Sequence, residues 1–452
     1  MKNFIERYFK IKERGSTIGI EVLGGLITFL AMVYIIPTTA NILANMGMDR
    51  GGVFVATALI SASTTIMMGL IGRVPLVLST GLGVTGFLTY TVYAATNDWR
   101  QALIVLFVVS IILLVIGVTP IRKKLLNALP KEIKLMISAG LGAFILFASL
   151  NTSGVIASGQ TQIGNLDQPQ VMLALFGMVT VLFLTFFPNK KLNQLAIPLA
   201  LVLTAVVGVV VNYGVLGGVE PGLPVYINSN WGGQGLEQVA FKIFDPADWQ
   251  AVFSNPSIYG VLFSLLLVQF FEVNTAIIPL TTQIDQVDDN GNPYNERRLF
   301  IADAVNGVIG APLGTSSTTT FLESSAGISV GARTGLMSVV TGLFLLLTAF
   351  IFPVFSIFTA TSVTSLAIFG IGTTILADSF KRVNWDDKAI AFATIFTVIF
   401  NILTNSVSDG IGFGFIFYVV MMLASKKGKQ VSIVTYVLAV IFVAYFIIKV
   451  TG

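Results

Sequence analysis

The stretch Ala311–Leu336, APLGTSSTTTFLESSAGISVGARTGL, combines a serine/threonine run, a glutamate and scattered glycines inside an almost uncharged part of the chain. Lipid cannot satisfy a backbone that leaves helical geometry, so such a membrane segment must be buried in protein or line a protein-walled cavity. An ionisable residue at membrane depth marks a candidate functional site, and Glu323 is such a residue. A second carboxylate, Glu272, lies in VQFFEVNT within another apolar run. Two acids beside interrupted helix predict a transport site.

The composition indicates a membrane protein. Of 452 residues, 55% are hydrophobic and only 11% are charged, and the mean hydropathy is +0.87. Soluble domains carry about 25% charged residues, so the chain is predicted to cross the membrane many times and to contact lipid over much of its surface. The net charge of +4 is small and its basic residues are dispersed, so nucleic acid is not expected as a partner.

The chain has no cysteine and no histidine. This composition excludes disulfides, thiol chemistry, Cys/His metal sites and imidazole proton relays. We therefore expect no metal and no cofactor, and any proton coupling must run through carboxylates and water. The sequence lacks a Walker-type GxxxxGK[ST] motif, which disfavours ATP coupling. Nothing in it supports an enzyme.

Apolar stretches of about 17–25 residues, the length of a membrane-crossing helix, recur along the chain. Two other stretches, 75–95 and 315–331, are rich in Gly, Ser and Thr and fit half-helices preceded by extended segments. We predict an all-α polytopic membrane protein whose remaining spans lie near 18–40, 53–72, 100–119, 132–150, 170–187, 194–213, 257–281, 299–313, 334–353, 360–378, 387–403, 408–425 and 431–450.

The distribution of basic residues predicts the orientation. With the N-terminus in the cytoplasm, most Lys and Arg fall on inner loops, as the positive-inside rule requires. The outer side then keeps only Arg50, Arg100, Lys242 and Lys449. We therefore expect a multi-pass protein of the cell (plasma or inner) membrane with a cytoplasmic N-terminus.

Two interrupted segments occupy matching places in the two halves of the chain. They are PLVLSTGLGVTGFL (Pro75–Leu88) and PLGTSSTTTFLESSAG (Pro312–Gly327), and each is third in a set of seven spans. Because seven is odd, the second set runs in the opposite sense across the membrane. Paired interruptions of this kind point to a transporter's binding site. The predicted fold is thus 14 spans in two inverted 7-span repeats, with short strand/half-helix breaks in spans 3 and 10 and an extra C-terminal helix at 431–450.

A half-helix that follows an extended segment exposes unpaired N–H groups and a partial positive charge. Two such ends, after Ser79-Thr80 and after Thr319-Thr320, can hold a flat polar ligand between them. Glu323 and Glu272 can accept hydrogen bonds from the ligand's N–H groups. The two acids can divide into one proton carrier and one ligand anchor.

Each feature also has a structural alternative. Glu323 can act only as the cap of its half-helix, and Glu272 can pair with hydroxyl or backbone groups for packing alone. The hydroxyls of Thr315–Thr320 can satisfy their own backbone. The glycines of Gly81–Gly86 fit close helix packing better than a phosphate loop, since the P-loop lysine is missing.

These residues stand in stretches typical of a known family. The stretches are TFLESSAGISVGARTGL (Thr320–Leu336), FFEVNT (Phe270–Thr275), IADAVNGVIGAPLGTSS (Ile301–Ser317), GLITFLAMVYI (Gly25–Ile35), and VPLVLSTGLGV with the following TYTV (Val74–Val92). In them the chain resembles the nucleobase–ascorbate transporter family, also called xanthine/uracil permeases, and within it the hypoxanthine/guanine/adenine permease branch. The resemblance runs from about residue 15 to residue 450.

The resemblance implies a core domain, residues 15–125 and 257–355, and a gate domain, residues 126–256 with the external loop and 356–452 with the C-terminal helix. It implies secondary active import of a purine-type nucleobase such as guanine, hypoxanthine, adenine or xanthine by alternating access, with H+ favoured over Na+, and a homodimer. Glu272 and Glu323 would bind substrate and couple it to the ion. The other implied substrate-binding residues are Thr85, Gly83, Thr320, Phe321, Gln269 and Thr275.

Several positions depart from the branch's usual pattern. Gln269 stands where an Asp is usual, and Glu272 where the acid is commonly Asp. Gly83-Val84-Thr85-Gly86 replaces GLNA, Thr39-Ala40 replaces Asn-Pro, and Arg73 replaces an Asn. These positions lie at the pocket or its walls, so the resemblance implies the transport class and leaves the particular base open. Uracil, a nucleoside or an anion is the alternative cargo.

Overall fold

The computed structural model describes residues 2–451 except 120–129, 158–161, 190–191, 194, 219–221, 226–234, 288–293, 295, 351–355, 359 and 405. For residues 2–3, 271–276, 278–279, 296–297, 300, 303–304, 306, 356 and 448–451 it describes the main chain alone.

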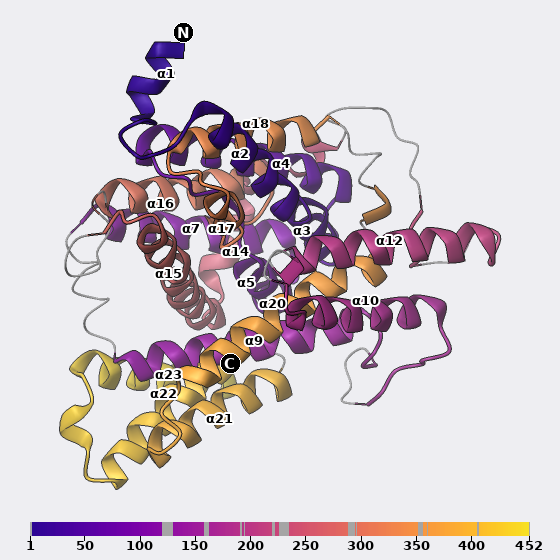
Figure 1. The fold of residues 1–452 in the computed structure, drawn as a ribbon. Helices are drawn as coiled ribbons and strands as arrows, with labels where there is room; N and C mark the ends of the chain where they lie inside the picture. The colour runs from indigo at the N-terminus through magenta and orange to yellow at the C-terminus, as the bar shows by residue number, and fades with distance from the viewer. Residues whose placement is uncertain are drawn as a thin grey trace.

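Helices make up nearly all of the described fold (Figure 1). Those of the first half are α1 (Lys2–Phe9), α2 (Ile18–Met32), α3 (Ile35–Ala44), α4 (Arg50–Met67), η1 (Met68–Gly72), α5 (Leu82–Phe87), η2 (Leu88–Val92), α6 (Tyr93–Thr96), α7 (Trp99–Val118), α9 (Lys131–Thr152), α10 (Pro169–Phe186) and α12 (Ala196–Gly214). Those of the second half are α13 (Leu236–Val239), η3 (Lys242–Phe244), α14 (Pro246–Ser254), α15 (Ser257–Gln283), α16 (Glu296–Leu313), α17 (Ser324–Ser329), α18 (Gly335–Thr348), η4 (Ser356–Phe358), α20 (Thr361–Arg382), α21 (Lys388–Leu403), α22 (Val407–Ala424), η5 (Gly428–Gln430) and α23 (Ile433–Thr451).

The predicted spans coincide with these helices. The first, 18–40, is confirmed, because α2 and α3 join through Val33 and Tyr34, both right-handed helical in backbone, and Ile18–Ala44 forms one apolar span. Pro37 falls in the first turn of α3, where its missing N–H costs no helical hydrogen bond. The connection between α12 and α15, predicted to be external, is partly helical, and its α14 meets the first part of α15 at 96°.

Eight of the described helices are long and apolar enough to cross a membrane, or nine if the bent pair α14–α15 counts as one span. The apolar helices α18, α21 and α23 are shorter, and the segments at the two predicted breaks contain only short helices. A multi-pass membrane protein is therefore supported. The arrangement of 14 spans in two inverted repeats stays a prediction, because length and composition do not identify interrupted spans.

The helices pack in two groups. In the first, α18 lies against α2 and α4, and α16 lies against α7 and α4. In the second, α9 lies against α20 and α21, α10 lies against α12 and α20, and α22 joins α21 to α23. Both groups bring together helices from the two halves of the chain, as the indigo α2 and α4 beside the orange α18 show (Figure 1).

Close approach within the first group depends on glycine. A Cβ on Gly335, at the start of α18, would lie 2.0 Å from the carbonyl oxygen of Gly69 in η1. A Cβ on Gly25 of α2 would lie 2.7 Å from the Val340 side chain of α18. Small residues let helix backbones meet, which is how membrane helices gain packing contacts without a hydrophobic driving force.

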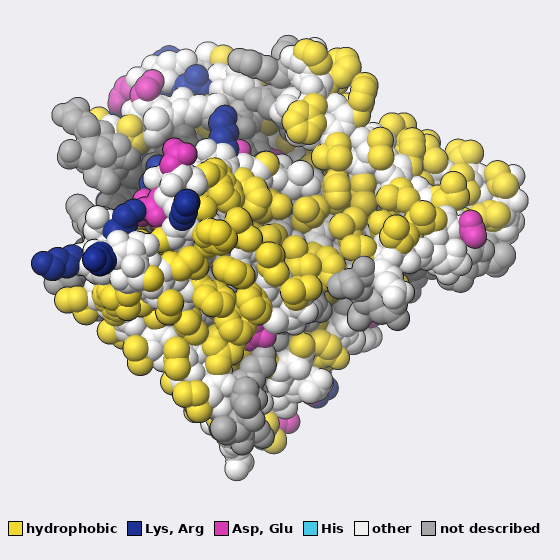
Figure 2. Space-filling view, turned by 90° about the horizontal axis from the view of Figure 1, so that it is seen from below, with side chains coloured by type: hydrophobic (Ala, Val, Ile, Leu, Met, Phe, Trp, Pro, Cys, Tyr) yellow, Lys and Arg dark blue, Asp and Glu magenta, His cyan; other side chains and the backbone are white. Residues whose placement is uncertain are grey.

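The outer surface is apolar where lipid would contact it. In Figure 2, hydrophobic side chains cover much of the visible face, and the Lys and Arg side chains gather at one margin. Large exposed side chains on α10 include Met172, Phe183 and Phe186. Such a surface would not stay dispersed in water, so it agrees with a membrane-embedded protein.

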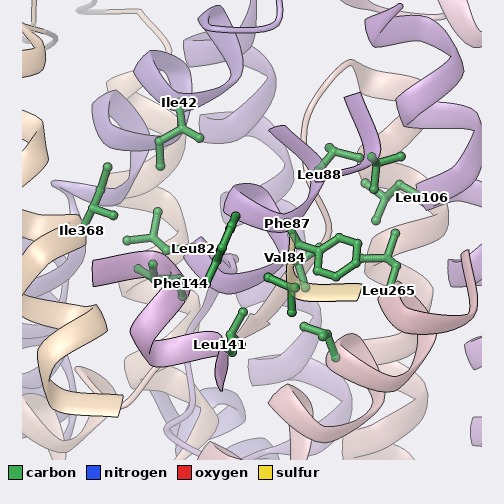
Figure 3. Packing of buried hydrophobic residues seen from close by; sticks show 14 of the residues in the cluster. Ile42, Leu82, Val84, Phe87, Leu88, Leu106, Leu141, Phe144, Leu265 and Ile368 are labelled. Carbon is green, nitrogen blue, oxygen red and sulfur yellow. The ribbon is translucent and has the colours of Figure 1, made fainter. Parts of the chain in front are cut away.

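The short helix α5 is held by apolar packing from the long helices around it. Figure 3 shows Leu82, Val84 and Phe87 of α5 among Leu141 and Phe144 of α9 and Leu265 of α15. Phe87 and Phe144 are fully buried. α5 continues through η2 into α6, and this packing holds its first turns beside the break.

Candidate functional site

The two extended segments predicted from the sequence lie against each other. Strand β1 (Leu78–Thr80) pairs with β2 (Thr318–Thr320) in antiparallel register, with Ser79 opposite Thr319. Each strand leads into a short helix, β1 into α5 and β2 into α17. All six strand residues are buried. The pairing therefore satisfies backbone groups that a non-helical segment would otherwise leave unpaired in the membrane.

Side-chain hydroxyls satisfy the remaining backbone groups of β1. The Thr65 hydroxyl donates to the Leu78 carbonyl (2.8 Å) and accepts from the Leu78 N–H (2.9 Å). The Val77 N–H donates to the Ser324 hydroxyl (3.1 Å). Thr and Ser on neighbouring helices thus replace the missing second strand partner.

The hydroxyls of β1 have partners, and those of β2 do not. Thr80 Oγ1 lies 2.6 Å from Thr39 Oγ1, and Ser79 Oγ lies 2.7 Å from Ser61 Oγ. In the described part of the chain, the hydroxyls of β2 residues Thr318, Thr319 and Thr320 have no hydrogen-bond partner. Their residues are only 3%, 8% and 4% exposed. A buried hydroxyl without a partner costs about 1–3 kcal/mol, so these three hydroxyls can form hydrogen bonds to a polar ligand.

A cavity of about 380 Å³ adjoins this strand and lies between the two groups of helices. Ligand pockets of this kind enclose about 300–1,000 Å³. The first group lines it with the start of α5 and with β2–α17, and the second with the ends of α10 and α12 and the middle of α20. The lining residues are Gly81, Leu82, Gly83, Thr185, Asn193, Ala196, Ile197, Pro198, Thr319, Thr320, Phe321, Leu322, Glu323, Ser325, Ala326, Ile371, Thr374 and Ile375.

Glu323 lines the cavity directly before α17. Its carboxylate makes no capping hydrogen bond to α17, so the alternative of a purely structural cap does not describe it. Instead Oε1 accepts a hydrogen bond from the Tyr34 hydroxyl at 2.7 Å. The carboxylate is only partly buried and is the acidic side chain among the residues that line the cavity.

The other predicted residues fall into three sets. Gly83, Thr320 and Phe321 line the cavity. Thr85 is buried in α5, where its hydroxyl donates to the Gly81 carbonyl at 2.7 Å. Gln269 is 7% exposed and its Oε1 has no partner among the described residues.

Gln269 lies on the side of α15 that faces α16. A Cβ added to Gly307 of α16 would lie 3.1 Å from Gln269 Nε2, so this amide is directed at the helix contact. Glu272 and Thr275 are on α15 by their main chain, and their side chains lie outside the described residues. Helix α15 contacts β2, α5 and α17, so its backbone passes beside the two breaks.

The sequence did not identify Tyr34 or Thr319 as site residues. Tyr34 belongs to a matching stretch of the first span, but its contact with Glu323 joins opposite halves of the chain, and no local pattern reveals it. Thr319 lies within the predicted hydroxyl run. Its orphan hydroxyl follows from the strand register, which no local pattern reveals.

Comparison with known proteins places this site in a family. Residues 19–408 match the model of the Permease family of xanthine/uracil permeases. The guanine/hypoxanthine permease PbuG of Bacillus subtilis (strain 168) is 34% identical, and the alignment covers 98% of this chain and 99% of that protein. The adenine permease AdeP of Escherichia coli (strain K12) is 30% identical, with coverage of 98% and 96%. The transmembrane domain of the cyanobacterial bicarbonate transporter BicA has a TM-score of 0.63 at 14% identity, over 86% of this chain and 97% of that chain, and so shares the fold.

Proposed function

The chain belongs to the xanthine/uracil permease family, and we propose that it is a secondary active transporter that imports a purine-type nucleobase. It is a permease and not an enzyme. The observation that carries the choice of cargo is the cavity wall, where a partly buried carboxylate, Glu323, stands next to unpartnered threonine hydroxyls.

A nucleobase matches this wall chemically. Its ring edge presents N–H donors, which a carboxylate accepts, together with ring nitrogens and carbonyl oxygens, which hydroxyls can donate to. Thr319 and Thr320 offer those donors. Phe321 and the backbone of Gly83 provide flat, apolar wall, where the missing Cβ lets a planar ring approach the chain. A guanine, hypoxanthine, adenine or xanthine ring could form hydrogen bonds to these buried hydroxyls.

We assign Glu272 as the second acid of the site, together with the positions Gln269 and Thr275 on the same helix and Thr85 on α5. The support is the course of α15 past β2, α5 and α17. Two carboxylates at one site allow a proton and a base to bind together, because protonating one acid removes repulsion while the other anchors the cargo. The coupling ion is then H+, and the carboxylates would carry it because the chain has no histidine.

We propose that the two packing groups move against each other as core and gate. The core is residues 15–125 and 257–355, the gate is 126–256 and 356–452, and together they form 14 spans in inverted repeats with a further C-terminal helix. Both breaks belong to the core, and the cavity lies where the core faces the gate. The protein would lie in the cell membrane as a homodimer with its N-terminus in the cytoplasm.

The cavity reaches Thr185 and Asn193, which flank the connection that carries the predicted cytoplasmic lysines Lys190 and Lys191. The conformation is thus assigned as inward-facing. Alternating access then requires the contacts between core and gate on the outer side to break in turn.

Anion transport is the second candidate, because the fold also occurs in a bicarbonate transporter. An anion site needs positive charge, and no Lys or Arg is among the described residues that line the cavity. The carboxylate of Glu323 would repel an anion there.

A binding screen on the purified protein tests the cargo. Guanine, hypoxanthine, adenine, xanthine, uracil, nucleosides and bicarbonate are compared by equilibrium binding and thermal shift. We expect at least one purine base to bind and bicarbonate not to bind; binding of bicarbonate alone would overturn the proposal. In proteoliposomes, a protonophore should abolish accumulation while removal of Na+ should not, and the opposite pattern would assign Na+ as the coupling ion.

A further inference from the structure

Tyr34 connects the first span to the cavity. It lies at the junction of α2 and α3 and is 5% exposed. Its hydroxyl donates to Oε1 of Glu323, directly before α17, at 2.7 Å, and α17 packs against α2. This contact is long-range, because Tyr34 and Glu323 come from opposite halves of the chain.

This bond restrains an otherwise mobile side chain. A glutamate has three rotatable bonds, and ordering them costs conformational entropy. In the described part of the chain, the hydrogen bond from Tyr34 is the one that the Glu323 carboxylate makes with another residue. An unrestrained carboxylate would present different acceptor positions to the cargo from one moment to the next.

The donor is also of the right kind. A tyrosine hydroxyl donates one hydrogen bond and occupies one of about four acceptor positions on a carboxylate. Oε2 is left for the cargo and for the coupling proton. A lysine or arginine at this place would neutralise the acid and compete with the cargo's N–H groups, whereas the neutral phenol orients the acid without doing so.

We propose that Tyr34 is a positioning residue of the transport site, which holds the Glu323 carboxylate in the orientation that binds the cargo's N–H edge. This inference rests on the proposed function of Glu323 as the cargo anchor. It adds the first span to the determinants of cargo affinity, through a side chain that is not among the residues lining the cavity.

The test uses Tyr34→Phe, which keeps the ring and removes the hydroxyl. Tyr445→Phe is the matched control, because the Tyr445 hydroxyl also donates to a buried carboxylate, Oδ1 of Asp409 (3.1 Å), on helices that do not line the cavity. The Kd of each purine base is measured on both variants and on the wild type, together with the thermal unfolding midpoint. We expect Tyr34→Phe to weaken binding about tenfold and Tyr445→Phe to change it less than twofold.

A purely structural role for Tyr34 is separated by a double-mutant cycle. In Glu323→Asp, whose carboxylate is withdrawn by one methylene, adding Tyr34→Phe should change the Kd less than twofold, because the bond is already lost. An equal tenfold loss in both backgrounds would overturn the proposal. If Glu323→Asp binds no base, a structure of Tyr34→Phe decides: an unchanged Glu323 conformation contradicts the proposal, and a new one supports it.

Failure of the inference and failure of the function are distinguishable. If the wild type binds none of the purine bases, the proposed function is wrong. If the wild type binds one of them and Tyr34→Phe binds it equally well, the function stands and Tyr34 has no positioning role.

Discussion

Two glutamates, Glu21 and Glu323, differ in how many hydrogen bonds their carboxylates accept. Glu21 of α2 is fully buried and accepts from three backbone N–H groups at the start of α18, those of Arg333 (2.8 Å), Thr334 (3.3 Å) and Met337 (3.2 Å). Glu323 lines a cavity and accepts from one hydroxyl, that of Tyr34. Both side chains join the two halves of the chain.

This difference is the basis on which we propose a structural role for Glu21 and a functional one for Glu323. At Glu21 the carboxylate supplies the hydrogen-bond acceptors that the first N–H groups of α18 lack. Folding therefore uses most of its acceptor positions. At Glu323 most of that capacity is left over, beside threonine hydroxyls that also lack partners. A membrane protein that leaves several polar groups unsatisfied at one place needs a polar ligand there.

The largest expected effect is at Glu323. Glu323→Gln keeps the size of the side chain and removes its charge, so we expect uptake of the purine base to fall at least about 100-fold, because a charged acceptor is lost and an amide N–H opposes the cargo's donors. Radiolabelled uptake in cells or proteoliposomes measures this. The folded yield and thermal midpoint should stay near those of the wild type, and uptake at the wild-type rate would remove Glu323 from the site.

At Glu21 we expect the opposite effect, a loss of stability without a loss of affinity. Glu21→Ala leaves backbone N–H groups of the α18 start buried without an acceptor, which should cost about 3 kcal/mol and lower the apparent unfolding midpoint in detergent by roughly 5 °C or more. The Kd of the base on the folded fraction should change less than twofold. Val22→Ala, at an exposed neighbour on the same helix, is the control. A lost affinity with intact stability would reverse the assignment of the two acids.

A smaller effect sharpens the comparison at the level of hydroxyls. Thr319→Val removes a hydroxyl that has no protein partner, so we expect about tenfold weaker binding of the base without loss of stability. Thr57→Val removes a hydroxyl that lies 2.7 Å from the Thr315 hydroxyl, and it should lower the unfolding midpoint and leave the Kd unchanged. Binding isotherms and thermal melts of both variants give the four values. If both variants changed the Kd and the unfolding midpoint alike, the presence of a hydrogen-bond partner would not distinguish a structural hydroxyl from a ligand-binding one.

The smallest effect concerns the contact that α3 makes with α20. Asn41 Nδ2 donates to the Thr364 hydroxyl at 2.8 Å, which joins the proposed core to the proposed gate. Asn41→Ala weakens this contact between α3 and α20 by about 1 kcal/mol. The ratio of outward-open to inward-facing protein should therefore rise roughly fivefold. Because the chain has no cysteine, Ser365→Cys gives a single thiol, buried in this conformation, whose labelling by an external maleimide should quicken about fivefold in Asn41→Ala. An unchanged rate would mean that this contact does not hold the gate.

Much of the architecture was predictable from local pattern. Apolar length located the spans, because lipid tolerates only chain segments that satisfy their own backbone. The Gly/Ser/Thr segments located the two breaks, and each proved to be a strand followed by a short helix. Glu323 was predicted because an ionisable side chain at membrane depth is energetically costly and marks a candidate functional site.

Other features had no local signal. The hydrogen bond from Tyr34 to Glu323 joins residues far apart in the sequence. The three N–H groups bound by Glu21 come from residues far along the chain. Gln269 was predicted to bind substrate, and it is directed at α16, a direction set by how α15 rotates against its neighbours; its role stays a prediction.

The amino-acid sequence alone determined that this protein crosses the membrane many times, with two interrupted segments and an acid beside one of them, because hydropathy and backbone satisfaction act over short stretches of chain. The permease class came from the resemblance of those stretches to a known family. The tertiary structure alone decided which polar groups find partners. It pairs Thr80 with Thr39 and Glu21 with the start of α18, and it leaves Thr319 and most of Glu323 to the cavity. Hydrogen bonds between distant segments depend on register and helix packing, which no local pattern contains.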